Sequence, residues 1–160
     1  MGNTMKELMR PIDLQEHPEG GRFREVFRSG IMVSKHDGTK RPSLTHIYFS
    51  LNSGEVSRFH KVASDEVWNL YQGRGVKLHI WEGTEKEPYT IILSEENNCF
   101  CHVIPAGIWQ AAEPISGKVL VGCSVAPGFD FADFTLMYQN SKEAKVLISL
   151  SPEMNKFITS

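Results

Sequence analysis

Hydrophobic and polar residues alternate along most of this chain, which is the pattern of strands with one buried face. The clearest example is 76–81, Val-Lys-Leu-His-Ile-Trp, and residues 43–51 and 118–125 are rich in the β-branched and aromatic residues that strands favour. Turn signals follow one another at intervals of roughly 8 to 12 residues. The pattern therefore predicts an all-β sandwich or barrel, built as a single domain over residues 1–160.

Both ends of the chain depart from this alternation. Residues 4–9 are good helix formers, with Thr4 at an N-cap position and Glu7 as its capping-box partner. Near the other end, Ser141 begins a second run of helix formers, and residues 151–152 are the Ser-Pro pair that often opens a helix. We therefore expect a short N-terminal helix and short C-terminal helices beside the β domain.

Composition limits the partners and the location of the protein. A formal net charge of -2 offers no attraction for nucleic acid, and no apolar run approaches the roughly 18 residues of a membrane helix. The three cysteines, Cys99, Cys101 and Cys123, are an odd number, and no secretory leader precedes them. We therefore expect a cytoplasmic protein that binds neither nucleic acid nor membrane.

The stretch from Gly54 to Gly73 holds the residues best suited to chemistry. Alternation places Arg58 and His60 on one face of a strand, and residues 63–65 have turn character. The next strand places Glu66 and Trp68 on one face, which a hairpin would bring against the first. The sequence thus predicts a concavity lined by a base, an acid, a guanidinium and an indole.

This stretch resembles the first motif of the cupin superfamily. Gly54, His60, Glu66 and Gly73 fall at the spacing of the motif, with Val62 in place of its second histidine. The second cupin motif is matched less completely further along the chain.

Pro105 and Gly107 match that second motif, with Gln110 in place of its histidine. A closer resemblance is to the cupin-5 group, also called DUF985. The segments that look like its signatures are 17–21, 45–51, 57–60, 64–68, 105–112 and 125–134. The resemblance implies a double-stranded β-helix, the jelly roll of cupins, and a homodimer.

The residues in the motif suit metal-free acid–base catalysis. His60 would take a proton from a carbon acid or hydroxyl, and Glu66 would fix its tautomer and stabilise its cation. Tyr48 is the candidate acid, with Tyr71 as an alternative. The arrangement is similar to that of sugar-nucleotide 3,5-epimerases, which are metal-free jelly rolls with a histidine base. We therefore expect a metal-independent isomerase or epimerase that acts on a polar carbonyl or sugar-like molecule and needs no cofactor.

Six residues are candidates for binding this substrate. Arg58 could hold a carboxylate, a phosphate or a developing enolate, or instead pair with a carboxylate on the surface. Trp68 and Trp109 could form apolar walls, or instead lie in the core or a dimer interface. The set as a whole is Glu19, Arg58, Trp68, Tyr71, Trp109 and Gln110.

Two other functions remain open at this point. The first is a non-catalytic cupin that binds or senses a small molecule. The second is a metal-dependent cupin enzyme with His60, Glu66 and Gln110 as ligands. Because Val62 contributes no donor and a glutamine carbonyl is a weak ligand, this set predicts at most a weakly bound divalent ion.

Overall fold

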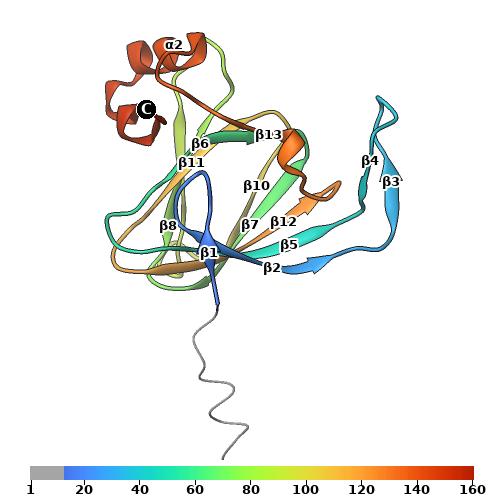
Figure 1. Cartoon of the computed structure of the whole chain (residues 1–160). Coiled ribbons are helices and arrows are strands. Elements are labelled where there is room, and N and C mark those ends of the chain that lie inside the picture. Colours follow the sequence, from blue (N-terminus) through green and yellow to red (C-terminus); the bar gives the residue numbers. More distant parts are fainter. Residues whose placement is uncertain (1–12) are drawn as a thin grey trace, which may run out of the picture.

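The computed structural model describes residues 13–160, so the helix expected at residues 4–9 lies outside the described part. Two antiparallel sheets form the body of the molecule (Figure 1). The larger sheet has the strand order β1 (Gln15–Glu16), β2 (Arg22–Arg28), β5 (Thr45–Leu51), β12 (Val119–Ala126), β7 (Asp65–Gln72) and β10 (Cys101–Ile104). The smaller has the order β13 (Phe134–Leu136), β6 (Ser57–Val62), β11 (Trp109–Pro114), β8 (Val76–Trp81) and β9 (Tyr89–Leu93).

In both sheets, strands that are far apart in sequence are neighbours. β12 lies between β5 and β7, and β11 lies between β6 and β8. This connectivity, in two sheets that pack face to face, is that of a jelly roll. The expected all-β fold, a double-stranded β-helix, is therefore confirmed.

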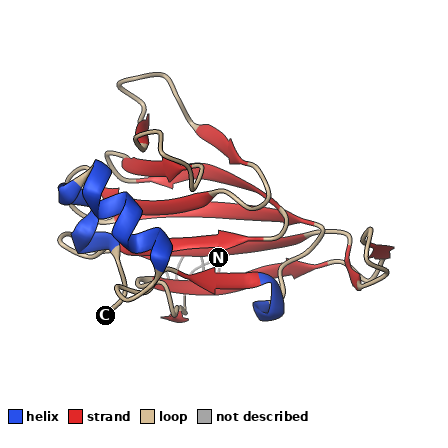
Figure 2. Cartoon of the chain, turned by 90° about the horizontal axis from the view of Figure 1, so that it is seen from above, coloured by secondary structure: helices blue, strands red, loops and turns tan. Residues whose placement is uncertain are grey.

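A short hairpin extends from this body. β3 (Met32–Ser34) and β4 (Lys40–Pro42) pair with each other, and Figure 2 shows this arm at the end of the molecule opposite to the C-terminal helices. Gly38 takes a φ of 83° in its turn, a conformation that glycine adopts without steric cost.

The main hydrophobic core fills the space between the sheets. Val76 and Leu78 on β8 are fully buried, while Lys77 between them is only half-buried, as alternation along a strand requires. Phe49 of the larger sheet meets Trp68 edge to face, with ring centroids 5.9 Å apart. Burial of one aliphatic side chain such as Leu78 stabilises the fold by about 1.5–3 kcal/mol.

A second core joins the C-terminal helices to the smaller sheet. The helices are α2 (Lys142–Leu150) and η2 (Pro152–Phe157), and a further turn, η1 (Phe131–Asp133), precedes β13. Ser141 caps α2 by accepting a hydrogen bond from the N–H of Ala144, and Pro152 opens η2, so the expected C-terminal helices are confirmed. Phe59 and Phe157 pack edge to face in this core. None of the helices within residues 13–160 has the length and apolar character needed to cross a bilayer.

The link between β6 and β7 differs from the expected hairpin. The two strands belong to different sheets, so residues 63–64 form a corner between sheets rather than a hairpin turn. His60 at one side of this corner and Glu66 at the other therefore reach the interior from facing sheets. The hairpin was predicted because alternation marks the faces of a strand but does not identify its neighbours.

Candidate functional site

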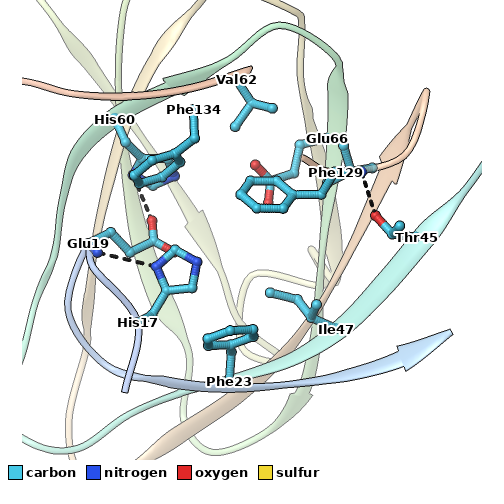
Figure 3. Close-up of a pocket in the computed structure, with 11 residues that line it drawn as sticks. His17, Glu19, Phe23, Thr45, Ile47, His60, Val62, Glu66, Phe129 and Phe134 are labelled. Carbon is cyan, nitrogen blue, oxygen red and sulfur yellow. Dashed lines mark hydrogen bonds and ion pairs between the residues drawn. The ribbon is translucent and has the colours of Figure 1, made fainter. Parts of the chain in front are cut away.

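A cavity opens at one end of the space between the two sheets (Figure 3). The empty space within the cavity is about 400 Å³. The centre of a water molecule can occupy only about 30 Å³ of this space, so the inner part is narrow. Both sheets and the loop after β1 contribute to its walls, which are mostly apolar. The lining residues are His17, Glu19, Phe23, Thr45, Ile47, His60, Val62, Glu66, Val125, Phe129 and Phe134.

His60 and Glu19 form an ion pair in the wall of the cavity. Nδ1 of His60 lies 2.6 Å from Oε2 of Glu19 and 2.8 Å from the carbonyl oxygen of Arg58. Both neighbours are acceptors, so Nδ1 carries a proton, and within residues 13–160 Nε2 has no hydrogen-bond partner. His60 therefore has one nitrogen free for a ligand in the cavity.

Electrostatics favour the charged form of this pair. Burial opposes a charge on His60, but Glu19, Glu66 and the carbonyl of Arg58 together outweigh this effect and raise the pKa of the imidazole. Burial likewise opposes a charge on Glu19, but His60, His17 and a 2.8 Å hydrogen bond from Ser57 together lower its pKa. Glu19, rather than Glu66, is thus the residue that orients His60.

His17 lies on the other side of Glu19. Its Nδ1 accepts the backbone N–H of Glu19 at 3.2 Å, which places the proton of the neutral ring on Nε2. Burial is the main reason why the pKa of His17 is lowered, so this imidazole is neutral. Its ring packs against Phe23 and Phe134, with centroid distances of 4.8 and 5.6 Å.

The loop that carries His17 and Glu19 is tied to the strands around it. The N–H of Arg58 on β6 donates to the carbonyl of Glu19 at 2.7 Å. Gly20 has a φ of 110°, and a Cβ there would collide with the carbonyl oxygen of Val56. Only glycine allows the loop to approach the strand this closely.

Glu66 enters the cavity from β7 and has a different environment. Its Oε1 accepts a hydrogen bond from Nε2 of Gln110 at 2.9 Å, and Oε1 of Gln110 in turn accepts from Nε1 of Trp68 at 2.7 Å. Burial raises the pKa of Glu66 to about 7, although the nearby His60 opposes the rise. Glu66 therefore exchanges a proton near neutral pH.

Comparisons with known proteins agree with this architecture. A family model described as "Cupin superfamily (DUF985)" matches residues 6–137. The chain belongs to the DUF985 family of cupins. The earlier resemblance is thereby confirmed.

Relatives of this DUF985 cupin are themselves without a stated activity. The chain is 24% identical to the uncharacterised protein YML079W of Saccharomyces cerevisiae, over 91% of this chain and 81% of the yeast protein. A hypothetical protein from Leishmania major is similar in structure with a TM-score of 0.78 and 25% identity, over 99% of this chain and 98% of that one. The protein SO0799 from Shewanella oneidensis has a TM-score of 0.76 and 28% identity, over 99% and 96% of the two chains.

The donor set of this cupin does not fit a divalent metal. Because an indole N–H can only donate, Trp68 holds the oxygen of Gln110, and the amide turns its NH₂ group toward Glu66. Gln110 therefore offers the cavity no ligand atom, and Val62 has none. Residues 13–160 also contain no group of three His, Cys, Asp or Glu side chains placed to hold a metal ion.

The structure brings together only part of the expected site. His60, Glu66 and Glu19 meet in the cavity, and Gln110 lies behind Glu66. Tyr48, expected as the acid, points to the opposite face of β5, where it packs edge to face against Tyr71. The inner face of this strand carries Thr45 and Ile47, and alternation puts the even-numbered positions outside.

Tyr71 is likewise on the outer face of the larger sheet. It is 46% exposed, and its hydroxyl lies 2.8 Å from Nε2 of His46. Neither tyrosine can reach a ligand held by His60 and Glu66. This is a correction to the expected geometry, because the sequence pattern did not show which face of these strands is inside.

The two tryptophans lie in cores. Trp68 is 1% exposed in the main core and touches the site only through Gln110. Trp109 belongs to the second core, where Lys61 lies over its ring at 4.8 Å. Of the two interpretations considered for these residues, the structure supports the core, not the cavity wall.

Arg58 does not face the cavity although it was expected beside His60. On β6, Ser57 pairs with Ala112 and His60 with Gln110, so β6 has one extra residue in this interval. Such a bulge breaks the alternation. The guanidinium of Arg58 donates to the carbonyl of Pro18 at 2.7 Å, away from the ligand space.

Several lining residues were not among the sequence candidates. His17, Phe23, Phe129 and Phe134 complete the cavity. Three of them lie in the DUF985 signature segments 17–21 and 125–134, which is the signal that could have pointed to them. Their side-chain positions, however, depend on contacts between distant segments.

Proposed function

We propose that this cupin is a metal-independent isomerase or epimerase that moves a proton at a carbon next to a carbonyl group of a polar, sugar-like small molecule. The observation that carries the proposal is a pair of proton-exchanging side chains, His60 and Glu66, which reach one buried cavity from facing sheets (Figure 3). Perturbed titration of two groups in one cleft is typical of catalytic sites.

His60 would act on the carbonyl oxygen. Glu19 holds its Nδ1 and raises its pKa, which favours the imidazolium, and this form presents a donor Nε2–H to the cavity. Donation of this proton to the oxygen neutralises the negative charge that develops when the neighbouring C–H bond breaks.

Glu66 would act on carbon. With a pKa of about 7 it is a carboxylate for much of the time at physiological pH, and it takes the proton as the C–H bond breaks and an enol forms. In the return step, neutral His60 removes a proton from an enol oxygen, which is its expected role as base, and the protonated Glu66 returns its proton to carbon. Loss of the proton from a neighbouring hydroxyl, with protonation of the former carbonyl carbon, gives isomerisation. Loss from the original oxygen, with protonation of the same carbon on its other face after the enol has turned over in the cavity, gives epimerisation.

A non-catalytic binding or sensing cupin is the second candidate. The narrowness of the inner cavity favours it, since space for one or two waters leaves little room for a reacting molecule to change shape. A metal-dependent reaction has less support, because Gln110 turns its amide nitrogen and not its oxygen toward Glu66.

Solvent exchange tests the proposed chemistry directly. Hydroxyacetone, which has a methylene next to its carbonyl, would be incubated with the protein in D₂O and followed by NMR. We expect deuterium to enter the methylene faster than in buffer. His60→Asn and Glu66→Gln should each lower the rate about 100-fold or more, the range of one acid–base group.

Tyr48→Phe is the matched control and should retain the wild-type rate, because Tyr48 lies on the outer face of β5. If hydroxyacetone bound saturably but exchanged no faster than in buffer, the binding function would replace the catalytic one. Loss of exchange in Tyr48→Phe would show that the site is not in this cavity.

A further inference from the structure

The charges around the cavity are unusual for a site that holds an anion. Among residues 13–160, no lysine or arginine lines it. Its ionisable groups are the carboxyl groups of Glu19 and Glu66 and the imidazoles of His17 and His60. His60 lies 2.6 Å from Glu19, and Glu66 accepts a hydrogen bond from the neutral amide of Gln110. When Glu66 is ionised, two carboxylates therefore share the one imidazolium of His60.

The nearest arginines are engaged elsewhere. Arg58 donates to the carbonyl of Pro18. Arg28 donates to Glu25 at 2.9 Å and to the carbonyl of Phe129 at 3.1 Å. Neither guanidinium lines the cavity, so neither is placed to hold a phosphate or carboxylate there.

A wider groove continues the cavity toward solvent. It shares Phe23, Thr45, Ile47 and Phe129 with the cavity and has about 930 Å³ of empty space, against about 400 Å³ in the cavity. Its charged side chains are Glu25, Arg28 and Asp130, so acidic groups outnumber basic ones here too. An anion would meet repulsion both on the way in and at the inner end.

A cation is also disfavoured at the inner end. The imidazolium of His60 faces the same narrow space as Glu66, so either sign of charge on a ligand meets a like charge at short range. Apolar walls such as Phe23 and Phe134 give little compensation for the lost hydration of a charged ligand.

We infer that the ligand of this cavity is an uncharged carbonyl compound that carries no phosphate, carboxylate or ammonium group. The carbonyl part rests on the proposed function, and the absence of charge rests on the side chains around the site. A neutral ligand finds Nε2 of His60 and the carboxyl of Glu66 as partners. Thr45 accepts the N–H of Phe129 at 2.9 Å, which leaves its O–H as a further donor.

Three small methyl ketones that differ in charge test this inference. They are hydroxyacetone, which is neutral, acetoacetate, an anion, and aminoacetone, a cation. Each would be titrated into the wild-type protein at about pH 7, where about half of Glu66 is ionised and aminoacetone is still mostly protonated, while the imidazole signals of His60 are followed by NMR. We expect hydroxyacetone to bind at least about tenfold more tightly than either ion.

Two matched variants locate the source of the selectivity. Glu66→Gln removes the unbalanced charge and should bring the affinity for acetoacetate to within a few fold of that for hydroxyacetone. Asp65→Asn removes the neighbouring carboxylate, whose Oδ1 accepts the N–H of Ala106 outside the cavity, and should leave the preference unchanged. Equal or tighter binding of acetoacetate or aminoacetone by the wild type would overturn the inference.

The result of the ketone-binding experiment can be distinguished from the result of the exchange experiment that tests the proposed function. Preferential binding of hydroxyacetone without deuterium exchange would retain the uncharged ligand and remove the catalytic role. Tighter binding of acetoacetate than of hydroxyacetone, with exchange of acetoacetate faster than in buffer, would retain the catalytic role and remove the uncharged ligand. Absence of binding by all three ketones at concentrations up to solubility would overturn the inference.

Discussion

Two buried glutamates in one cavity have opposite titration behaviour. Glu19 is surrounded by groups that favour its charged form, so its pKa is lowered despite burial. Glu66 has one amide donor, so burial dominates and its pKa rises to about 7. The first is thus suited to holding His60 and the second to exchanging a proton, and the difference lies in their neighbours rather than in residue type.

This difference predicts a pH-dependent stability. The folded pKa of Glu66 is above its usual 4.5, so its stabilising contribution is fully present below about pH 4.5 and is lost as pH rises through about 7. The Glu66→Gln variant has no carboxyl group at this position, so its stability does not fall in this way as pH rises. Relative to wild type, the variant should therefore gain on the order of 3 kcal/mol in free energy of unfolding between about pH 4.5 and pH 8.5.

Urea denaturation of both proteins at the two pH values measures this gain. Asp65→Asn, a change to an exposed carboxylate on the same strand, is the control and should show much less pH-dependent gain. A constant difference between Glu66→Gln and wild type across this range would mean that Glu66 is ionised in the folded protein as easily as in the unfolded one.

At the scale of elements, the site depends on how one loop and one irregular strand fit together. The loop after β1 carries His17 and Glu19, and β6 carries His60 past a bulge. The backbone bond from Arg58 to Glu19 joins them, and Gly20 permits the approach. The ion pair of the site is therefore a consequence of backbone packing.

Substitution of Gly20 tests this dependence. Gly20→Ala should lower stability and displace Glu19, so the pKa of His60, measured by NMR, should fall. Gly38→Ala is the matched control, because Gly38 also has a positive φ but has nothing near its Cβ position. We expect Gly38→Ala to cost roughly 1–2 kcal/mol for the backbone alone, and Gly20→Ala to cost more. Equal costs and an unchanged His60 pKa would contradict this account.

At the scale of the whole molecule, the two hydrophobic cores that stabilise the fold lie outside the site. One core lies between the sheets behind the cavity, and a second lies under the C-terminal helices. On β6, His60 faces the cavity while Phe59 packs in the second core. The same strand thus connects the site to the second core.

A homodimer, implied by the family resemblance, is a proposal at this scale. Ile31 and Met32, where the chain enters the arm, are 72% and 53% exposed, and apolar side chains of this kind are often covered by a second chain. Light scattering at micromolar concentration should therefore give a mass twice that of one chain. A mass equal to one chain would contradict the proposal.

The sequence by itself was sufficient for the fold class, the C-terminal helices and the two ionisable residues His60 and Glu66. Alternation, capping residues and motif spacing are local signals, and they survive folding because short-range backbone geometry produces them. The local signals predicted an all-β domain, and the family resemblance specified it as a jelly roll.

Only the tertiary structure decided which groups meet. It paired His60 with Glu19, turned the oxygen of Gln110 toward Trp68, and placed Tyr48 outside. The physical reason is that alternation assigns residues to two faces of a strand without stating which face is inside or which strand is adjacent. A single bulge, such as that near Arg58, then exchanges the faces, and only contacts between distant segments determine where it lies.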